Sequence, residues 1–230
     1  MASRPLSVVL VSSGLDSAVL LAHEAALYDV RPLYVRSGLT WEAAELAMLT
    51  RLIAAPAFAA LMPLTVVELP MHDVYPPTHW AIAGTPPAYD TPDEDCYLVG
   101  RNLTLLVKAG VVAARVESRR IALGPLAGNR FPDATPAFFT AMAEALSRGL
   151  ALPISVVTPF SALHKAQVIE LGARLGVPFE LTLSCMNPDG ERHCGRCSKC
   201  RERRDAFSEA GVFDPTPYAN PSPRRHGDRA

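Results

Sequence analysis

The sequence predicts an α/β fold, with a doubly wound, mostly parallel sheet of five strands and a small cysteine-rich unit near the C-terminus. Short runs of β-branched and large apolar residues alternate with longer stretches rich in Ala and Leu, which is the pattern of parallel strands joined by crossover helices. Hydrophobic residues make up 49% of the 230 residues and charged residues 20%, which suffices for one main core. Four of the five cysteines crowd between positions 185 and 200, which sets the C-terminal segment apart.

Strands and helices are expected in alternation from the N-terminus. The predicted strands are residues 7–11, 32–35 and 65–69, each of them short and rich in large apolar residues. The predicted helices between them are residues 17–28 and 41–55, whose apolar residues recur at helical spacing. Parallel neighbours need a crossover of about a dozen residues or more, so the alternation itself indicates a parallel sheet.

A long segment rich in Pro and acidic residues, 70–95, interrupts this alternation. It is longer than an ordinary connection within a compact domain. We therefore expect a lid or a binding loop here, which contains His72 and His79.

The alternation resumes after this segment. Helices are predicted over residues 103–116, 136–148 and 164–175, and strands over 121–124 and 154–157. From residue 183 onward the chain holds the cysteines, a short Arg-rich helix and a Pro-rich tail that begins at 214.

Charge and hydropathy narrow the classes of partner. The 22 basic and 23 acidic residues leave a net charge of −1, so neither a nucleic-acid backbone nor an anionic membrane is expected as the main partner. Every apolar stretch is shorter than the ~20 residues of a membrane span, and the first residues lack the apolar core of a signal peptide. These features predict a cytoplasmic protein, in which clustered cysteines more often bind a metal or catalyse than form disulfides.

The turn after the first strand has the composition of a phosphate-binding loop. It reads Ser-Ser-Gly-Leu-Asp-Ser over 12–17, directly before a helix. Small residues let backbone N–H groups approach a phosphate, and the helix N-terminus adds positive potential. The glycine spacing fits neither a Walker A loop nor a dinucleotide-binding motif. The alternative is an ordinary connection in which Asp16 or Ser17 caps the helix.

Cys185, Cys194, Cys197 and Cys200 provide the four thiolates of a tetrahedral structural zinc site. Four sulfurs close the coordination, so the metal should hold the fold rather than activate water. An iron–sulfur cluster and a redox disulfide are the alternatives. His193 is expected beside the site rather than among its ligands. The basic residues around the cysteines could contact RNA or a phosphate, or form a solvated basic face.

The loop at 12–17 is also similar to the Ser-Gly-Gly-x-Asp-Ser loop of the N-type ATP pyrophosphatases, which cleave ATP between its α and β phosphates. Ser13 stands at the first Gly of that pattern. Residues 158–178, with Thr-Pro-Phe followed by a helix that contains Lys165, resemble a second segment of the same superfamily. The resemblance implies that Lys165 faces the nucleotide phosphates, and a solvent-facing lysine is the alternative.

Together with Gly-Arg-Asn at 100–102, Phe-Pro-Asp at 131–133 and the four cysteines, these segments resemble the 7-cyano-7-deazaguanine synthase family, QueC or ExsB, of queuosine biosynthesis. They occur in family order from residue 8 to about 218. The resemblance implies an adenine nucleotide alpha hydrolase-like fold of the HUP or Rossmann-like type. It also implies a ligase that forms C–N bonds, converting 7-carboxy-7-deazaguanine and ammonia to the nitrile preQ0 through an adenylated intermediate, with ATP, Mg and structural Zn.

The resemblance assigns roles by position. Asp16, Arg101 and Lys165 would be catalytic, and Arg101 would contact the substrate together with Phe131 and Asp133. An apolar plug at Phe131 and a helix-capping acid at Asp133 are the alternatives. The family motif Tyr-Gly-Gln-x-His-x-x-Glu aligns here through Glu45 but without its Gln and His. The ATP loop would comprise Val11, Ser12, Ser13, Gly14, Leu15, Asp16, Ser17 and Ala18.

The expected organisation is an ATP pyrophosphatase domain over 1–183, a zinc-binding segment over 184–218 and a tail over 219–230. A homodimer would be in keeping with the family, and the expected partners are the small substrates. One alternative is a related ATP pyrophosphatase that amidates another acceptor or thiolates tRNA, although Cys96 stands apart from the other cysteines in the sequence. A zinc-knuckle RNA-binding protein is the non-enzymatic alternative.

Overall fold

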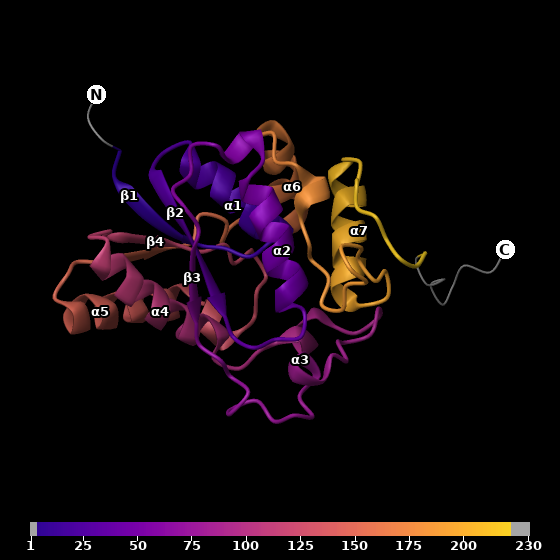
Figure 1. The fold of residues 1–230 in the computed structure, drawn as a ribbon, viewed down its shortest axis with the longest axis horizontal. Helices are drawn as coiled ribbons and strands as arrows, with labels where there is room; N and C mark the ends of the chain where they lie inside the picture. Colours follow the sequence, from indigo (N-terminus) through magenta and orange to yellow (C-terminus); the bar gives the residue numbers. More distant parts are fainter. Residues whose placement is uncertain (1–3, 222–230) are drawn as a thin grey trace.

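The computed structural model describes residues 4–221, apart from the side chain of Asp93, and places a five-stranded sheet between helical layers (Figure 1). The strand order is β3-β2-β1-β4-β5 and every pairing is parallel, which confirms the predicted doubly wound sheet. The strands are β1 (Leu6–Leu10), β2 (Asp29–Arg36), β3 (Thr65–Glu68), β4 (Arg120–Ala122) and β5 (Ser155–Val157).

The helices follow the predicted alternation, with boundaries shifted by a few residues. β2 begins at Asp29, three residues before the predicted start, because it pairs with β1 from Leu6 onward. α4 begins two residues early because Gly100 adopts a left-handed conformation (φ 75°) that starts the helix there. The α-helices are α1 (Leu15–Ala25), α2 (Glu42–Ile53), α3 (Trp80–Ala83), α4 (Arg101–Arg115), α5 (Pro136–Leu150), α6 (Lys165–Arg174) and α7 (Ser198–Ala210), with 3-10 turns at Pro56–Phe58, Asp93–Cys96, Pro132–Ala134 and Phe179–Leu181.

Helices cover both faces of the sheet (Figure 1). Alternate strand residues point to opposite sides, so Val9 and Tyr34 pack under α1, α2 and α6. Val8 and Leu33 pack under α4 and α5. A sheet buried on both faces explains why its strands read as nearly continuous apolar runs.

The C-terminal helix α7 packs beside α6 and contributes to the same core. Phe207 meets Phe179 edge to face, with ring centroids 5.2 Å apart. Arg203 is only 1% exposed, and its guanidinium donates to Thr182 Oγ1 at 2.8 Å and to Asp214 Oδ1 at 3.2 Å. The cysteine-rich segment is thereby fastened to the side of the sheet unit. The division at 183/184 stays a prediction, and most of the predicted tail, 222–230, lies outside the described residues.

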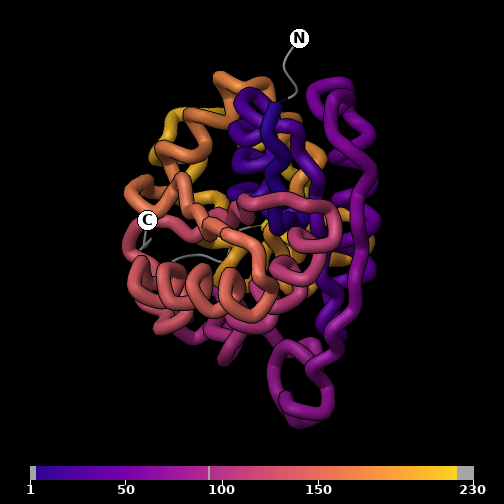
Figure 2. The backbone as a smooth tube through the Cα atoms, turned by 90° about the vertical axis from the view of Figure 1, so that its left-hand side faces the viewer, coloured from indigo at the N-terminus to yellow at the C-terminus, as the bar shows by residue number. Residues whose placement is uncertain are grey.

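The segment between β3 and α4 projects from the body of the molecule (Figures 1 and 2). It contains α3, and it is attached by aromatic contacts. The ring of Trp80 stacks on Trp41 at 5.6 Å, and the hydroxyl of the buried Tyr75 donates to the carbonyl of Val99 at 2.8 Å. The imidazole of His79 accepts from an N–H of α3, so this histidine caps a helix. That the segment acts as a lid or binding loop stays a prediction.

Within the described part of the chain, α-helices that are both long and apolar enough to cross a bilayer are absent.

Candidate functional site at the strand ends

The candidate site lies between β1 and β4, at the point in the sheet where the connections that follow the strands switch from one face to the other. The connection after β1 enters α1 on one face, whereas the connection after β4 leads to α5 on the other face. In open parallel sheets such a switch point leaves a crevice beyond the carboxyl ends of the strands, which is where ligands bind. A cavity of about 380 Å³ occupies this crevice. Residues of the predicted loop line it, together with the end of β2, the start of α4 and the segment after β4: Leu10, Val11, Ser12, Gly14, Asp16, Ser17, Tyr34, Val35, Trp41, Glu45, Arg101, Asn102, Leu105, Leu123, Gly124, Pro125 and Asn129.

The predicted phosphate loop is held open by its own serines. The hydroxyl oxygen of Ser17 accepts the N–H of Ser12 at 2.8 Å, and the hydroxyl oxygen of Ser12 accepts the N–H of Gly14 at 3.0 Å. Gly14 is the N-cap of α1, without a side-chain cap. Neither Asp16 nor Ser17 therefore caps the helix. The first N–H groups of α1 keep no side-chain acceptor and can bind a ligand in the cavity.

Ser13 fits where the superfamily pattern has glycine because its backbone does not need a positive φ. Among the described residues, the non-glycine positions with positive φ are Glu117 and Ala151. The side chain of Ser13 is fully buried, and its carbonyl accepts the N–H of Leu183 at 2.8 Å. The phosphate loop is thus joined to the segment that leads to the first cysteine of the cluster.

Lys165 lies at the start of α6 and reaches the loop. Its Nζ is 3.1 Å from Asp16 Oδ2 and 2.5 Å from Glu202 Oε1, and its side chain is 17% exposed. The solvent-facing alternative for Lys165 is therefore wrong. Burial alone would lower the pKa of Lys165, but the carboxylates of Asp16 and Glu202 outweigh it and raise that pKa above its usual value. The side chain stays an ammonium at neutral pH.

Glu202, on α7, is a site residue that the sequence did not single out. Its second oxygen, Oε2, accepts from Lys199 Nζ at 2.6 Å. Burial would raise the pKa of Glu202, but the ammonium groups of Lys165 and Lys199 lower it to about 2. In the sequence, Lys199 and Glu202 show only the i, i+3 spacing of a common surface pair, and the contact with Lys165 spans 37 positions.

Asp16 has one oxygen that fits a cation. Its Oδ1 is buried and has no hydrogen-bond partner among the described residues, whereas Oδ2 faces Lys165. A buried, unpartnered carboxylate oxygen is costly unless a ligand satisfies it. Oxygen ligands of this kind suit Mg²⁺, which usually binds one or two protein carboxylates together with substrate phosphates.

Arg101 and Glu45 contribute ionisable groups to the lining of the first cavity. The guanidinium of Arg101 donates to the hydroxyl of Ser37, which follows β2. Glu45 is buried on α2, and its Oε2 accepts the hydroxyl of Tyr34 at 2.6 Å. Burial raises the pKa of Glu45, and the Tyr34 hydrogen bond and the Arg101 charge only partly offset this effect.

Asp133 supports this wall without lining it. Its Oδ2 accepts the backbone N–H of Asn102 at 2.8 Å, and its carbonyl accepts the Asn102 side chain at 2.8 Å. Asp133 is therefore a helix-capping acid, as the alternative expected, but the helix whose N–H it accepts is α4. The helix that follows Asp133, α5, has Thr135 as its N-cap. A direct contact of Asp133 with substrate stays a prediction.

A second cavity, of about 540 Å³, adjoins the first and shares Asp16, Gly124, Pro125 and Asn129 with it. Phe131 lies on its wall with its ring stacked on Tyr97 at 4.7 Å. Two adjoining cavities offer room for a nucleotide and an acceptor. The remaining lining residues come from the 3-10 turn Asp93–Cys96, from the loop after β4, from α6 with its N-cap and from α7: Glu94, Leu126, Ala127, Gly128, Arg130, His164, Lys165, Lys199, Arg201, Glu202, Asp205, Ala206 and Glu209.

The four clustered cysteines form a site that fits a tetrahedral metal ion. The ligand atoms of Cys185, Cys194, Cys197 and Cys200 all lie within 4.8 Å of one another. Three of the sulfur pairs are separated by 3.9, 3.8 and 3.5 Å. A tetrahedron with Zn–S bonds of about 2.3 Å has S···S edges of about 3.8 Å. All four cysteines are free thiols, so the structure does not support the redox disulfide.

His193 stands beside this cluster, as predicted. Its Nε2 accepts the backbone N–H of Ser184 at 3.0 Å, so this hydrogen bond occupies the nitrogen and Nε2 is not a metal ligand. Burial, with the charge of Arg203, lowers the pKa of His193 to about 3, which keeps the imidazole neutral.

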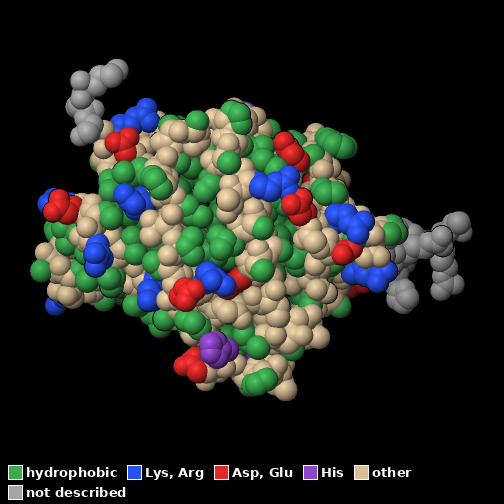
Figure 3. Space-filling view, in the orientation of Figure 1, with side chains coloured by type: hydrophobic (Ala, Val, Ile, Leu, Met, Phe, Trp, Pro, Cys, Tyr) green, Lys and Arg blue, Asp and Glu red, His purple; other side chains and the backbone are tan. Residues whose placement is uncertain are grey.

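Most basic residues around the cysteines bind the chain itself. Arg203 is buried, Arg204 donates to the carbonyls of Gly195 and Asn220, and Arg201 donates to those of Tyr89 and Thr91. These contacts do not support a basic face for RNA. The face in Figure 3 accordingly shows acidic and basic side chains interspersed.

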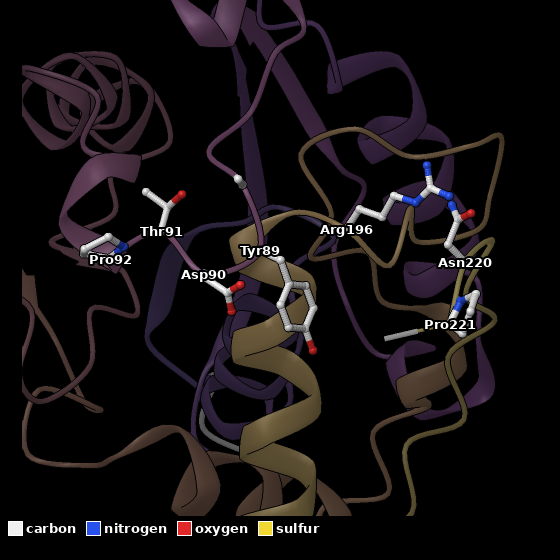
Figure 4. Close-up of a pocket in the computed structure, with 8 residues that line it drawn as sticks. Tyr89, Asp90, Thr91, Pro92, Arg196, Asn220 and Pro221 are labelled. Atoms are coloured by element: carbon white, nitrogen blue, oxygen red, sulfur yellow. The ribbon is translucent and has the colours of Figure 1, made fainter. Parts of the chain in front are cut away.

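A third hollow lies between residues 88–92 of the segment before α4 and the C-terminal part of the chain, and it shares no residue with the first cavity. Arg196 and Asn220 lie side by side on one wall, and Tyr89 and Asp90 lie across from them (Figure 4). No predicted site residue lines this hollow.

Comparison with known proteins identifies one family. The family model described as queuosine biosynthesis protein QueC matches residues 6–211. A 7-cyano-7-deazaguanine synthase from Anaeromyxobacter dehalogenans is 36% identical over 225 residues, which cover 93% of this chain and 95% of the relative. A protein of the same name from Thermosynechococcus vestitus is 41% identical over 130 residues, and that match spans about half of each chain, 54% and 55%.

A solved structure supports the fold. The U34-tRNA thiolase NcsA from Methanococcus maripaludis superposes with a TM-score of 0.50 at 10% identity, covering 92% of this chain and 74% of that one. At this identity the likeness concerns the fold alone.

Proposed function

The chain belongs to the QueC family of queuosine biosynthesis proteins, and from that membership we propose that it is an ATP-dependent ligase. It converts 7-carboxy-7-deazaguanine and ammonia into 7-cyano-7-deazaguanine. The observation that supports this proposal best is the meeting, around two adjoining cavities that share Asp16, of the predicted phosphate loop and the guanidinium of Arg101 in the first and the ammonium of Lys165 in the second. The proposed setting is the cytoplasm.

The proposed reaction needs two activations. A carboxylate is a poor acyl donor, so its oxygen first attacks the α phosphorus of ATP and pyrophosphate leaves. Ammonia then displaces AMP, which carries one carboxyl oxygen away, and an amide results. A second adenylation, on the amide oxygen, lets the other oxygen depart with AMP and leaves the nitrile. Both oxygens of the substrate are thus transferred to AMP.

The residues of the crevice are suited to this sequence of steps. The N–H groups at the start of α1 would bind the β and γ phosphates, because a helix N-terminus favours anions. The Lys165 ammonium would stabilise the charge that develops on the departing pyrophosphate. Arg101, at the start of α4, would hold the α phosphate or the substrate carboxylate in a two-pronged contact.

Two metals are part of the proposal. Asp16 would hold Mg²⁺ through its buried Oδ1, and the ion would supply charge neutralisation at the phosphates. The four cysteines would hold structural zinc. The deazaguanine would lie in the part of the second cavity near Phe131, and the phosphates would reach Lys165 in the same cavity past Asp16, which both cavities share. Ammonia would arrive free or from a partner protein, and a homodimer would be in keeping with the family.

A tRNA thiolase is the second candidate that the fold allows. In this structure all four clustered cysteines converge on one point, away from the phosphate loop, and the sulfur of Cys96 lies 3.3 Å from the hydroxyl of Ser198 on α7. A persulfide-carrying cysteine beside the nucleotide is not found among the described residues that line the first cavity. The nitrile-forming ligase is therefore the better supported of the two.

The test is turnover by the pure protein with ATP, magnesium, ammonium and 7-carboxy-7-deazaguanine. The nitrile, detected by its mass, should accumulate together with AMP and pyrophosphate. ATP turnover with other carboxylates but never with this one would refute the acceptor and leave the adenylating chemistry in place.

A further inference from the structure

We propose that Glu202 is a positioning residue for Lys165, so that the helix leading out of the cysteine cluster orients an ammonium group at the phosphate loop. The inference rests on the proposed function for the chemistry that Lys165 serves. It assigns to the C-terminal segment a part in the active site beyond holding the fold.

The contacts of Lys165 define its direction. Its Nζ lies between a carboxylate of α1, Asp16 Oδ2 at 3.1 Å, and a carboxylate of α7, Glu202 Oε1 at 2.5 Å. An ammonium has three N–H donors. With two of them directed to carboxylates on opposite sides, the third is left for a ligand in the cavity that Lys165 lines.

Glu202 is itself fixed from two sides. Its other oxygen accepts from Lys199 at 2.6 Å, so both carboxylate oxygens are held. The next residue, Arg203, is buried and donates to Thr182 Oγ1 at 2.8 Å and to the carbonyl of Phe179 at 3.1 Å. Successive helix residues are about 100° apart, so the fixed Arg203 also fixes the direction in which Glu202 leaves α7.

The start of α7 determines where this carboxylate lies along the helix axis. Cys197 is the N-cap of α7 and Cys200 lies in its first turn, two positions before Glu202. The backbone of the neighbouring Ser198 donates to the carbonyl of Pro87 at 3.2 Å. The cysteine cluster therefore sets the position of the carboxylate that holds Lys165.

Removal of the Glu202 charge should redirect Lys165 without removing it. In Glu202→Gln the ammonium keeps Asp16 as its only carboxylate and turns toward α1. We expect kcat to fall about tenfold or more, while the KM for ATP changes less than about threefold, because the backbone groups that bind the ground state remain and the transition-state contact is lost.

The matched control is Glu144→Gln, which removes an exposed carboxylate paired with Arg148 at 2.6 Å on α5 and should leave both constants unchanged. Glu202→Asp keeps the charge on a shorter side chain and should recover part of kcat. Metal content and melting temperature are measured for all three variants. If Glu202→Gln loses its metal and Glu202→Asp is equally inactive, Glu202 is merely structural and the proposal is wrong.

A second readout does not depend on turnover. The chain has three lysines, Lys108, Lys165 and Lys199, so acetylation by an amine-reactive reagent can be followed peptide by peptide. In Glu202→Gln, the Lys165 amine should become about tenfold more reactive at pH 8 for each unit by which its pKa falls. Lys108, on the opposite side of the sheet, is the internal reference.

The two readouts separate the two proposals. If the wild-type protein does not convert the deazaguanine but Lys165 becomes reactive in Glu202→Gln, the proposed function fails and the positioning role stands. Unchanged Lys165 reactivity, or a wild-type kcat in Glu202→Gln, would overturn the positioning role.

Discussion

Individual side chains at the strand ends account for the proposed chemistry. Asp16 has one oxygen paired with Lys165 and the other buried without a partner among the described residues, and it does not cap its helix. Burying such a group unpaired is unfavourable for the fold alone. In the proposed function, a magnesium ion that binds together with the nucleotide would satisfy this oxygen.

The first prediction concerns these two residues. Lys165→Ala and Asp16→Asn should each lower kcat/KM for ATP by about 100-fold or more, since removal of one preorganised contact to developing charge costs about 10²–10³ in rate. Turnover is measured as pyrophosphate release, and the fold is monitored by melting. Lys108→Ala, outside both cavities, is the matched control and should keep wild-type turnover. Wild-type rates of pyrophosphate release in both site variants would show that neither Lys165 nor Asp16 takes part in catalysis.

The second prediction is a pH dependence of stability that Glu45 causes. Burial raises the pKa of Glu45 in the folded protein above its value in the unfolded chain. Between these two pKa values the folded state therefore binds more protons than the unfolded state. Its contribution to stability is thus fully present below pH ~4.5 and is lost as pH rises through the folded pKa. Glu45→Gln keeps an acceptor for Tyr34 and stays neutral.

Melting temperature measured from pH 5 to pH 9 checks this. At pH 9, Glu45→Gln should melt at a higher temperature than the wild type, by about 2–4 °C for each kcal/mol that the substitution adds to the free energy of unfolding. This difference in melting temperature should shrink toward pH 5. A constant difference across this range would show that the Glu45 carboxyl does not titrate there.

At the scale of the elements, α4 shows how a loop acid positions a site wall. Asp133 accepts the N–H of Asn102 and so fixes the first turn of α4, which carries Arg101. Thr135 is the N-cap of α5 and accepts the N–H of Phe138 at 3.2 Å, and it lines neither cavity. The two caps form a natural pair for comparison.

The third prediction uses this pair. Asp133→Ala should lower the free energy of unfolding by about 1–2 kcal/mol and should also reduce turnover, because the partly buried N–H of Asn102 loses its acceptor and Arg101 is displaced. Thr135→Ala should cost about 1 kcal/mol and leave turnover unchanged. Denaturant unfolding and pyrophosphate release are the measurements. Equal turnover in the two variants would contradict a role of Asp133 in holding the site wall.

The elements themselves were largely predictable from the sequence. Apolar runs and helical spacing located every strand and most helices within a few residues, because both signals are local. The early start of α4 depends on the left-handed Gly100, which a periodicity does not reveal. α3, of four residues, is too short to leave a periodic signal.

The partnerships between distant residues were not predictable from local patterns. Asp133 could be read as a capping acid, but the helix it caps lies earlier in the chain, 31 positions away. Glu202 meets Lys165 across 37 positions, through the packing of α7 on α6. The predicted phosphate loop and the four cysteines stand out in the sequence because their residue types and spacing are themselves the signal. Phosphate binding by the loop stays a prediction.

For the molecule as a whole, the cysteine cluster and the crevice at the strand ends belong to one connected structure. The phosphate loop is bonded to Leu183, two residues before Cys185, and α7 begins within the cysteine cluster. Loss of the metal should therefore disturb α7 and the contact of Glu202 with Lys165 before the sheet unfolds.

The fourth prediction tests this order of events. Cys197→Ser should bind less metal, and its melting temperature should fall, because structural zinc contributes folding free energy directly. Metal analysis of the unchelated wild type should give zinc, about one per chain. Cys96→Ser, outside the cluster, is the control and should keep its metal. Iron in the wild type, or full metal content in Cys197→Ser, would contradict the assignment.

The most direct test of the proposed double adenylation traces where the two carboxylate oxygens of the substrate go. 7-Carboxy-7-deazaguanine labelled with ¹⁸O in its carboxylate is incubated with the pure protein, ATP, magnesium and ammonium, and all products are analysed by mass. We expect an oxygen-free nitrile group in the product and the ¹⁸O label in AMP. Label in inorganic phosphate together with ADP, or AMP that forms without taking up label, would contradict the double adenylation.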